Sequence, residues 1–140
     1  MIEGRQSPLL ILADTTVLYS GLAYRGLESK VLFSRAHVFV TTEFTMADIL
    51  RILTTKRALT KSEAIGLIDA MPVLVTEFAL IKDRWEEADR LIGRRDRSDV
   101  PLVALALTIE NHDGIWSTDK DFDVLRGRFK VWKTRELLKR

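Results

Sequence analysis

The stretch from Leu9 to Asp14, LLILAD, decides the fold, because an unbroken apolar run ends there in an acid. A continuous run of this kind is typical of a strand that is buried on both faces, as in a parallel sheet covered by helices. The next segment, TTVLYSGLAY, places Val17, Leu18 and Leu22 near helical spacing. The segment therefore predicts a strand, an acid at its carboxyl end, and a helix.

The same alternation of short apolar runs and amphipathic segments continues to the C-terminus. Further strands are expected at 38–40, 73–75, 114–118 and 130–134. Helices are expected at 29–37, 41–58, 60–71, 78–94, 99–111 and 135–140, with Thr60 and Glu63 at the spacing of a capping box. Alternating strands and helices predict an α/β fold, in which a mostly parallel five-stranded sheet lies between two helical layers.

Length and composition limit the class of protein. A chain of 140 residues with 46% hydrophobic and 30% charged residues fits one globular domain and argues against disorder. There are no cysteines, which excludes disulfides and thiolate metal sites. No apolar run approaches the roughly 20 residues of a membrane helix, so we expect a cytoplasmic protein without a membrane partner. The opening MIEGR resembles a protease-cleavage linker, so 1–8 is interpreted as a tag or leader and 9–140 as the single domain.

Two aspartates directly follow strands. Asp14 follows the first strand and Asp119 follows the fourth. Ligands of open α/β sheets bind beyond the carboxyl ends of the strands, so the two side chains converge if these strands are neighbours. The alternatives are a helix N-cap for Asp14 and an Asx-turn for Asp119. For Asp121 and Asp123, a solvated turn is the main interpretation.

Two more aspartates precede the apolar segment PLVALAL. Asp99 is interpreted first as a helix cap, a role that Ser98 could also take, with Pro101 in the first turn. A helix buried on most sides carries its N-terminus into the interior, however, so Asp99 need not face solvent. Asp96 lies in a basic loop and could pair with Arg95 or Arg97.

Two acids fall in the segment 41–58. Asp48 lies inside the expected helix, where aspartate is unfavourable, and an exposed pair with Arg51 is the alternative to a functional role. Glu43 lies at the start of the helix, where the helix dipole favours a negative charge. An offset of five residues turns the two side chains about 140° apart, so both are not expected to reach one site from a regular helix.

A shared position for these acids would require a cation. Two unit charges 5 Å apart repel by about 3 kcal/mol at an effective dielectric of 20. All-oxygen ligands suit Mg²⁺ or Mn²⁺, which catalyse phosphodiester hydrolysis.

Removing four carboxylates from a net charge of +2 leaves +6 for the rest of the chain. A positive charge of this size suits a polyanionic partner, although a solubilising surface is the alternative. Basic residues cluster at Arg94, Arg95 and Arg97 and toward the C-terminus. No serine-hydrolase elbow, Walker A motif or dinucleotide glycine pattern occurs.

Four segments together resemble the conserved blocks of PIN domains, and most closely those of VapC-type toxins from prokaryotic toxin–antitoxin pairs and their free-standing relatives. They are LILADTTVLYSGL, TTEFTMADILRIL, DRSDVPLVALAL and WSTDKDF. The resemblance implies a three-layer α/β/α sandwich and metal-dependent endonucleolytic cleavage, mostly of RNA. It also implies a homodimer and a small antitoxin that blocks the acidic cleft.

The resemblance implies a catalytic and metal-binding quartet of Asp14, Asp48, Asp99 and Asp119. The family usually has glutamate at the position of Asp48, which is one methylene shorter, and Glu43 could compensate for the shorter reach. The family usually has asparagine where this chain has Thr16, whose hydroxyl could hydrogen-bond Asp14. We expect the other supporting residues, which would orient the phosphate or water or flank the site, at Asp96, Ser117, Thr118 and Asp121.

Three functions follow from this sequence. The main prediction is a Mg²⁺- or Mn²⁺-dependent ribonuclease, with the arginines of 94–97 holding the RNA backbone. The second is a catalytically weak or inactive module of the same fold that binds RNA or a protein partner. The third is a phospho-accepting receiver, which ranks last because Thr15 and Thr16 follow Asp14 where a receiver has an acidic pair.

Overall fold

One parallel sheet organises the computed structural model, which describes residues 7–140. The strands are β1 (Leu10–Ala13), β2 (Val38–Thr42), β3 (Val73–Thr76), β4 (Ile115–Trp116) and β5 (Val131–Trp132). They lie in the order β3-β2-β1-β4-β5, and every pairing is parallel. This confirms the predicted five-stranded sheet. Of the leader predicted at 1–8, residues 1–6 lie outside the described residues, whereas Ser7 and Pro8 are exposed.

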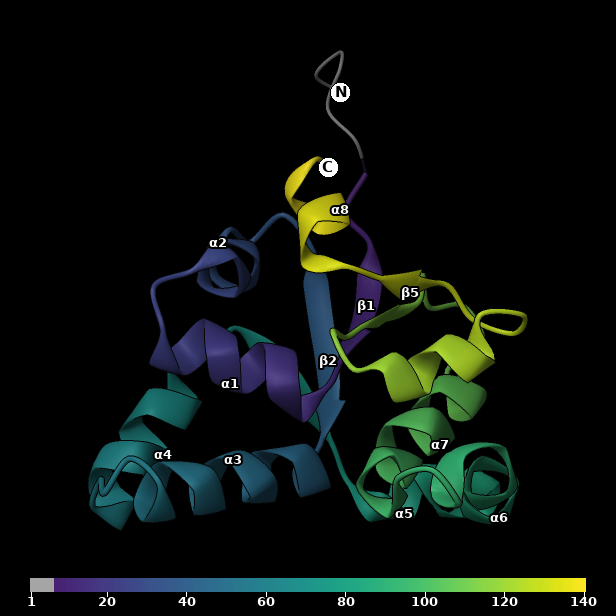
Figure 1. Ribbon diagram of the computed structural model, residues 1–140, viewed down its shortest axis with the longest axis horizontal. Coiled ribbons are helices and arrows are strands. Elements are labelled where there is room, and N and C mark those ends of the chain that lie inside the picture. The colour runs from purple at the N-terminus through teal and green to yellow at the C-terminus, as the bar shows by residue number, and fades with distance from the viewer. Residues whose placement is uncertain (1–6) are drawn as a thin grey trace.

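Helices cover both faces of the sheet (Figure 1). One face carries α1 (Thr15–Ala23), α2 (Leu27–Phe33), α3 (Glu43–Thr55), α4 (Lys61–Asp69) and α8 (Thr134–Leu138). The other carries α5 (Phe78–Ile81), α6 (Trp85–Ala88) and α7 (Val100–Thr108). A short 3-10 helix, η4 (Lys120–Leu125), closes the second face beside β5. The result is the predicted three-layer α/β/α sandwich.

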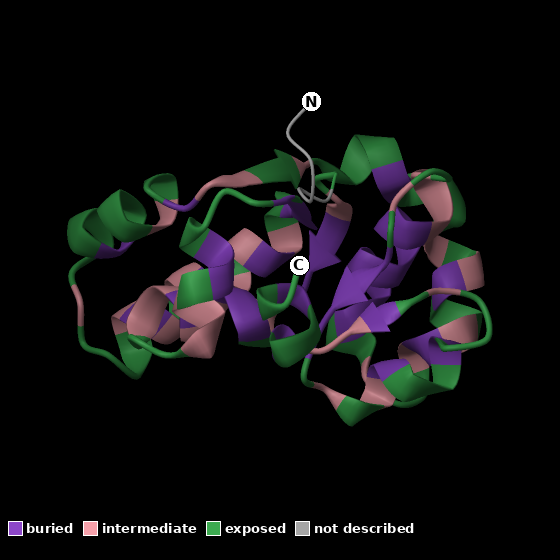
Figure 2. Ribbon diagram, turned by 90° about the horizontal axis from the view of Figure 1, so that it is seen from above, coloured by how far each residue is buried: buried purple, intermediate pink, exposed green. Residues whose placement is uncertain are grey.

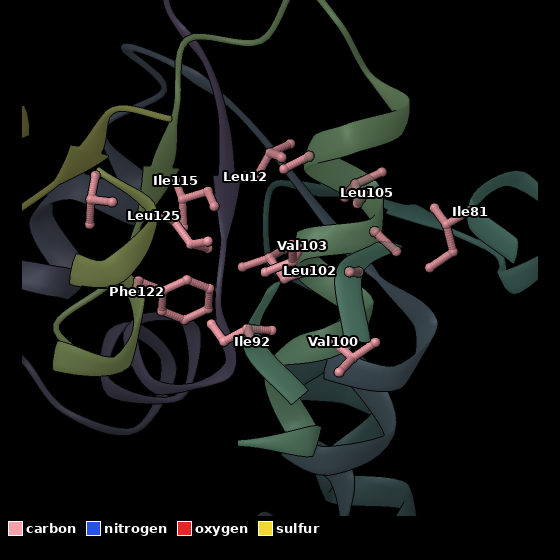
Figure 3. Close-up of a cluster of buried hydrophobic side chains, with 14 of the residues drawn as sticks. Leu12, Ile81, Ile92, Val100, Leu102, Val103, Leu105, Ile115, Phe122 and Leu125 are labelled. Atoms are coloured by element: carbon pink, nitrogen blue, oxygen red, sulfur yellow. The ribbon is translucent and has the colours of Figure 1, made fainter. Parts of the chain in front are cut away.

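The alternation of side chains along the strands gives each face its own core. Leu12 and Ile115 pack with α7 on one face, whereas Ile11 and Trp116 pack with α1, α2 and α3 on the other. Figure 3 shows the first cluster, which includes Ile115 of β4 together with Phe122 and Leu125 of η4. The buried residues of both cores line the sheet, and exposed residues occupy the outer turns (Figure 2). No helix in residues 7–140 is long and apolar enough to cross a membrane.

Two predicted helices differ from the structure. The segment expected as one helix over 78–94 contains α5, the 3-10 helix η1 (Lys82–Arg84), α6 and the π-helical turn η2 (Asp89–Gly93). Overwound and underwound turns offset each other, so Ile81, Ala88 and Ile92 all stay buried and the hydrophobic period does not reveal the breaks. The helix expected at 29–37 begins at Leu27 and ends at Phe33, because Arg35 takes a left-handed φ of 60°.

Candidate metal centre

The candidate site lies at the carboxyl edge of the sheet, where β1 and β4 are neighbours. Ala13 is paired with Trp116, so Asp14 and Ser117 come next on adjacent strands. The condition for the convergence of Asp14 and Asp119 is therefore met. On the other side of β1, the Thr41 hydroxyl donates to the Ala13 carbonyl at 2.8 Å, which ties β2 to the same edge.

Asp14 has two roles, because it caps α1 and also faces β4. Its Oδ1 accepts a hydrogen bond from the Val17 N–H at 3.0 Å, as the capping interpretation predicted. Its Oδ2 accepts a short hydrogen bond from the hydroxyl of Ser117, which is fully buried. The Ser117 Oγ in turn accepts from the Asp119 N–H at 2.9 Å. Ser117 thus connects the two acids and has no exposed surface with which to contact a phosphate.

Asp99 is buried without a hydrogen bond to one of its oxygens. It ends the one-turn 3-10 helix η3 (Arg97–Asp99), directly before the apolar α7, and is 9% exposed. Its Oδ2 is buried and has no hydrogen-bond partner. Asp99 occupies the N-cap position of α7, as the first interpretation predicted, but its carboxylate accepts no capping bond from that helix, and Ser98 bonds to Asp96. The interior position of the α7 N-terminus is the physical reason, since it turns Asp99 toward the other acids.

Four carboxylates meet around Asp99. Asp96, Asp99, Asp119 and Asp121 each offer an oxygen, and these oxygens all lie within 4.8 Å of one another. The Asp96 Oδ1 accepts from the Ser98 N–H and hydroxyl at 2.9 and 2.6 Å, and the Asp121 N–H donates to the Asp119 Oδ1 at 2.9 Å. The Asx-turn interpretation of Asp119 is thus also correct. We call these four residues the acid cluster.

The cluster contradicts two simpler interpretations of its members. Within residues 7–140, Asp96 forms no ion pair with Arg95 or Arg97. Asp121 is half-buried rather than fully solvated. Asp96 caps η3 in an extended conformation and Asp99 ends that turn, so the three-residue spacing of two acids across a short turn is the sequence signal for this pair. Asp123 is exposed and paired with Arg126 and Lys133, as expected of a surface turn.

Burial and like charges raise the pKa values of two acids. Burial raises the pKa of Asp99 to about 8, with smaller contributions from the negative charges of Asp96, Asp119, Asp14 and Asp121. Burial also raises the pKa of Asp14 to about 6, against the lowering effect of its hydrogen bond from Ser117. A carboxyl group in this state favours either a proton or a bound cation. The oxygen-only donor set suits a hard divalent ion.

The remaining candidate residues lie at or outside the margin of the site. Asp48 is half-buried on the second turn of α3, outside the acid cluster and without an ion pair to Arg51 within residues 7–140. The Glu43 carboxylate accepts from the Phe78 N–H at 2.6 Å, so it holds the start of α5 rather than extending the reach of Asp48. Thr16 and Thr118 are exposed, and Thr16 acts on Asp14 through its backbone N–H rather than its hydroxyl.

The three arginines of 94–97 are exposed beside the acid cluster. Arg94, Arg95 and Arg97 form no ion pair within the part of the chain that the structure describes. Arg97 belongs to η3, the turn that also carries Asp99. A basic rim therefore adjoins the acids, as the charge pattern predicted.

Comparison with known proteins agrees with this geometry. A family model described as the PIN domain matches residues 12–140. The fold is similar to the crystal structure of Mycobacterium tuberculosis VapC20, a toxin that cleaves the Sarcin-Ricin loop. That likeness has a TM-score of 0.60 at 18% sequence identity and covers 86% of this chain and 96% of the other. No curated protein matches the sequence. Because the family model spans nearly the whole chain, this protein belongs to the PIN-domain family.

Proposed function

We propose that this protein is a metal-dependent endoribonuclease that cleaves RNA phosphodiester bonds at the carboxyl edge of its sheet. The observation that carries the proposal is the buried Oδ2 of Asp99, which has no partner and lies among other carboxylates. An isolated buried carboxylate is costly unless a proton or cation neutralises it. The PIN-domain assignment supports a nuclease, and the basic rim supports a polyanionic substrate.

The residues present fit a divalent ion. Asp14, Asp99 and Asp119 are proposed as ligands, together with further oxygens of the acid cluster, and Mg²⁺ or Mn²⁺ is the ion expected for such a set. When bound, the ion would supply an activated water and stabilise the leaving oxygen of the phosphodiester. Asp14 lies outside the acid cluster, but Ser117 links it to Asp119 and its charge acts on Asp99. Asp48 has no such link to the acids within residues 7–140, so it stays outside the proposed set.

The protein's own residues position these groups. Ser117 and the Val17 N–H fix the Asp14 carboxylate in one orientation. The Ser117 hydroxyl also fixes the backbone before Asp119. Thr118 is exposed next to the site and remains free to contact a phosphate. Arg94, Arg95 and Arg97 would hold the RNA backbone, so RNA binding should weaken steeply as salt concentration rises.

The likeness to VapC20 supports a more specific proposal. We infer that the chain is the toxin of a toxin–antitoxin pair, that it acts in the cytoplasm as a homodimer, and that a small antitoxin protein covers its acidic edge. The antitoxin's contact would be cationic, because the acid cluster has no arginine or lysine partner in residues 7–140.

Cleavage of a mixed RNA pool with Mn²⁺ tests the proposed activity, with Asp14→Asn as the matched variant. We expect Mn²⁺-dependent cleavage that EDTA stops and that Asp14→Asn abolishes. Equal cleavage by the variant would show a contaminating nuclease and would contradict the proposal.

A catalytically weak module that binds RNA or a protein partner is the second candidate. The shorter side chain and outlying position of Asp48 favour it. Calorimetry separates the two, because a module of this kind needs no divalent ion. Absence of Mn²⁺ binding at millimolar concentration would support the module and exclude the metal-dependent nuclease.

A further inference from the structure

We propose that Asp96 and Asp121 complete the cation site of this protein beside Asp99 and Asp119, in the place that other PIN domains give to the acid on α3. The proposal rests on the proposed function only in that it assumes a divalent ion at this edge. It assigns two ligands that family resemblance does not transfer to this chain, and it removes Asp48 from the set.

The spacing of the oxygens fits one ion. Ligands around an octahedral ion with bonds of about 2.1 Å lie about 3.0 Å apart when adjacent and about 4.2 Å apart when opposite. The four oxygens of the acid cluster lie within 4.8 Å of one another. A contraction of a few tenths of an ångström, within the freedom of two aspartate torsions, would bring all of them to a single ion.

The hydrogen bonds of the acid cluster leave at least one oxygen of each carboxylate available to bind an ion. Asp99 is 9% exposed, its Oδ2 is buried without a hydrogen-bond partner, and its carboxylate is one of the four in the acid cluster. Asp96 and Asp119 each use only Oδ1, in bonds to Ser98 and to the Asp121 N–H. Their Oδ2 atoms and the Asp121 carboxylate accept no hydrogen bond within residues 7–140. Asp14 accepts one hydrogen bond on each oxygen, and each of these oxygens keeps a second lone pair for the ion.

The positions of the short helices explain why the ligands come from η3 and η4 rather than from α3. Asp96 caps η3 and Asp99 ends it, whereas Asp119 caps η4 and Asp121 lies in its first turn. Both short helices pack against η2. Two acids thus come from each of two turns on one side of the site. The α3 side offers only Asp48, because Glu43 bonds to the Phe78 N–H. In this proposal, Asp96 on η3 and Asp121 on η4 supply the ligand oxygens that the short side chain of Asp48 does not.

Calorimetric titration with MnCl₂ tests this assignment in the full chain without RNA. The variants are Asp96→Asn, Asp121→Asn and Asp48→Asn, with Asp123→Asn as the matched control on η4. We expect Asp96→Asn and Asp121→Asn each to weaken Mn²⁺ binding by at least about tenfold. Asp48→Asn and Asp123→Asn should stay within about twofold of wild type. Melting curves in EDTA check that each variant folds, and the amide oxygen introduced by Asp96→Asn can still accept the bonds from Ser98.

The outcomes separate this proposal from the proposed function. If wild type binds Mn²⁺ but Asp48→Asn weakens binding as much as Asp96→Asn, the ligand assignment is overturned and the metal-dependent nuclease stands. Wild-type affinity in both Asp96→Asn and Asp121→Asn also overturns the assignment. If wild type itself binds no Mn²⁺ at millimolar concentration, both proposals fail.

Discussion

Two groups of carboxylates in this protein differ in their partners, because one group is paired with arginine or lysine side chains and the other is not. All five ion pairs within residues 7–140 involve Glu87, Asp123 or Glu136, each partly exposed beside an arginine or lysine. We call this the paired surface. None of the five involves Asp14 or the acid cluster, although Asp121 and Asp123 are two residues apart on the same short helix.

The position of an aspartate on η4 determines whether its carboxylate pairs with a basic side chain or joins the acid cluster. Asp123 turns outward to Arg126 and Lys133, at 3.1 and 3.8 Å. Asp121 turns inward to three other carboxylates. An exposed pair contributes little to stability, whereas an unpaired group of buried acids destabilises the folded state until a proton or an ion binds. The acid cluster is therefore expected to govern metal binding, activity and pH dependence, and the paired surface none of them.

The largest expected difference is in catalysis. Asp119→Asn should lower Mn²⁺-dependent RNA cleavage by on the order of 100-fold or more, because it removes a charged oxygen ligand. Asp123→Asn removes the same charge four residues away and should leave cleavage nearly unchanged. Initial rates on one RNA substrate measure both. Equal losses in the two variants would mean that overall charge, not the acid cluster, controls activity.

The second difference concerns stability in EDTA as a function of pH. The pKa of Asp99 is about 8 in the folded state, against about 4 for an ordinary aspartate. The folded state therefore binds more protons, and stability falls as pH rises from about 4 to about 8. Asp99→Asn should remove much of this slope and stabilise the protein at pH 8 by on the order of 1–3 kcal/mol. Urea unfolding across pH measures it, and an unchanged slope would contradict the raised pKa.

Ser117 should have a smaller effect that reaches both stability and activity. Ser117→Ala removes the donor to Asp14 and the acceptor for the Asp119 N–H, so we expect a loss of about 1–3 kcal/mol in the free energy of unfolding. Cleavage should also fall, since Asp14 would no longer be held in one orientation. Thr118→Ala, at the exposed neighbour, should be stable to within about 0.5 kcal/mol. A Ser117→Ala variant as stable as wild type would show that the bridge contributes nothing.

The smallest effect belongs to the paired surface. Arg126→Ala should change the free energy of unfolding by about 0.2–1 kcal/mol, and the change should shrink in high salt. Asp123 retains Lys133 as a second cation, which limits the loss further. Thermal melts at low and high ionic strength measure the change. A larger loss of unfolding free energy that does not depend on salt would show that this surface stabilises the fold more than exposed ion pairs do.

Much of this comparison could be predicted from sequence. The sequence predicted a strand before Asp14 and another before Asp119 in a mostly parallel sheet, and it left their adjacency as a condition that the pairing of β1 with β4 meets. The nearly all-apolar α7 indicated that Asp99 need not face solvent, and Asp99 is buried. These inferences succeed because strand positions and helix burial depend on local hydrophobic patterns.

The details that depend on distant contacts could not be predicted. The bond from Glu43 to the Phe78 N–H joins residues 35 apart, and no local pattern signals it. The acid cluster needs η3 and η4 to face each other, which follows from the packing of both against η2. Asp121 and Asp123 look alike in the sequence, and only tertiary structure assigns one to the acid cluster and the other to the paired surface.

The central claim is that the acid cluster stays partly protonated, chiefly at Asp99, until a divalent cation binds and displaces the proton. Calorimetry of Mn²⁺ binding at pH 7, in buffers of different ionisation enthalpy, counts the protons released per ion. Because the pKa of Asp99 is about 8, this carboxyl is mostly protonated at pH 7, and binding should release about one proton. The release should nearly vanish in Asp99→Asn and persist in Asp123→Asn. Binding without proton release, or the same release from Asp99→Asn, would contradict the account.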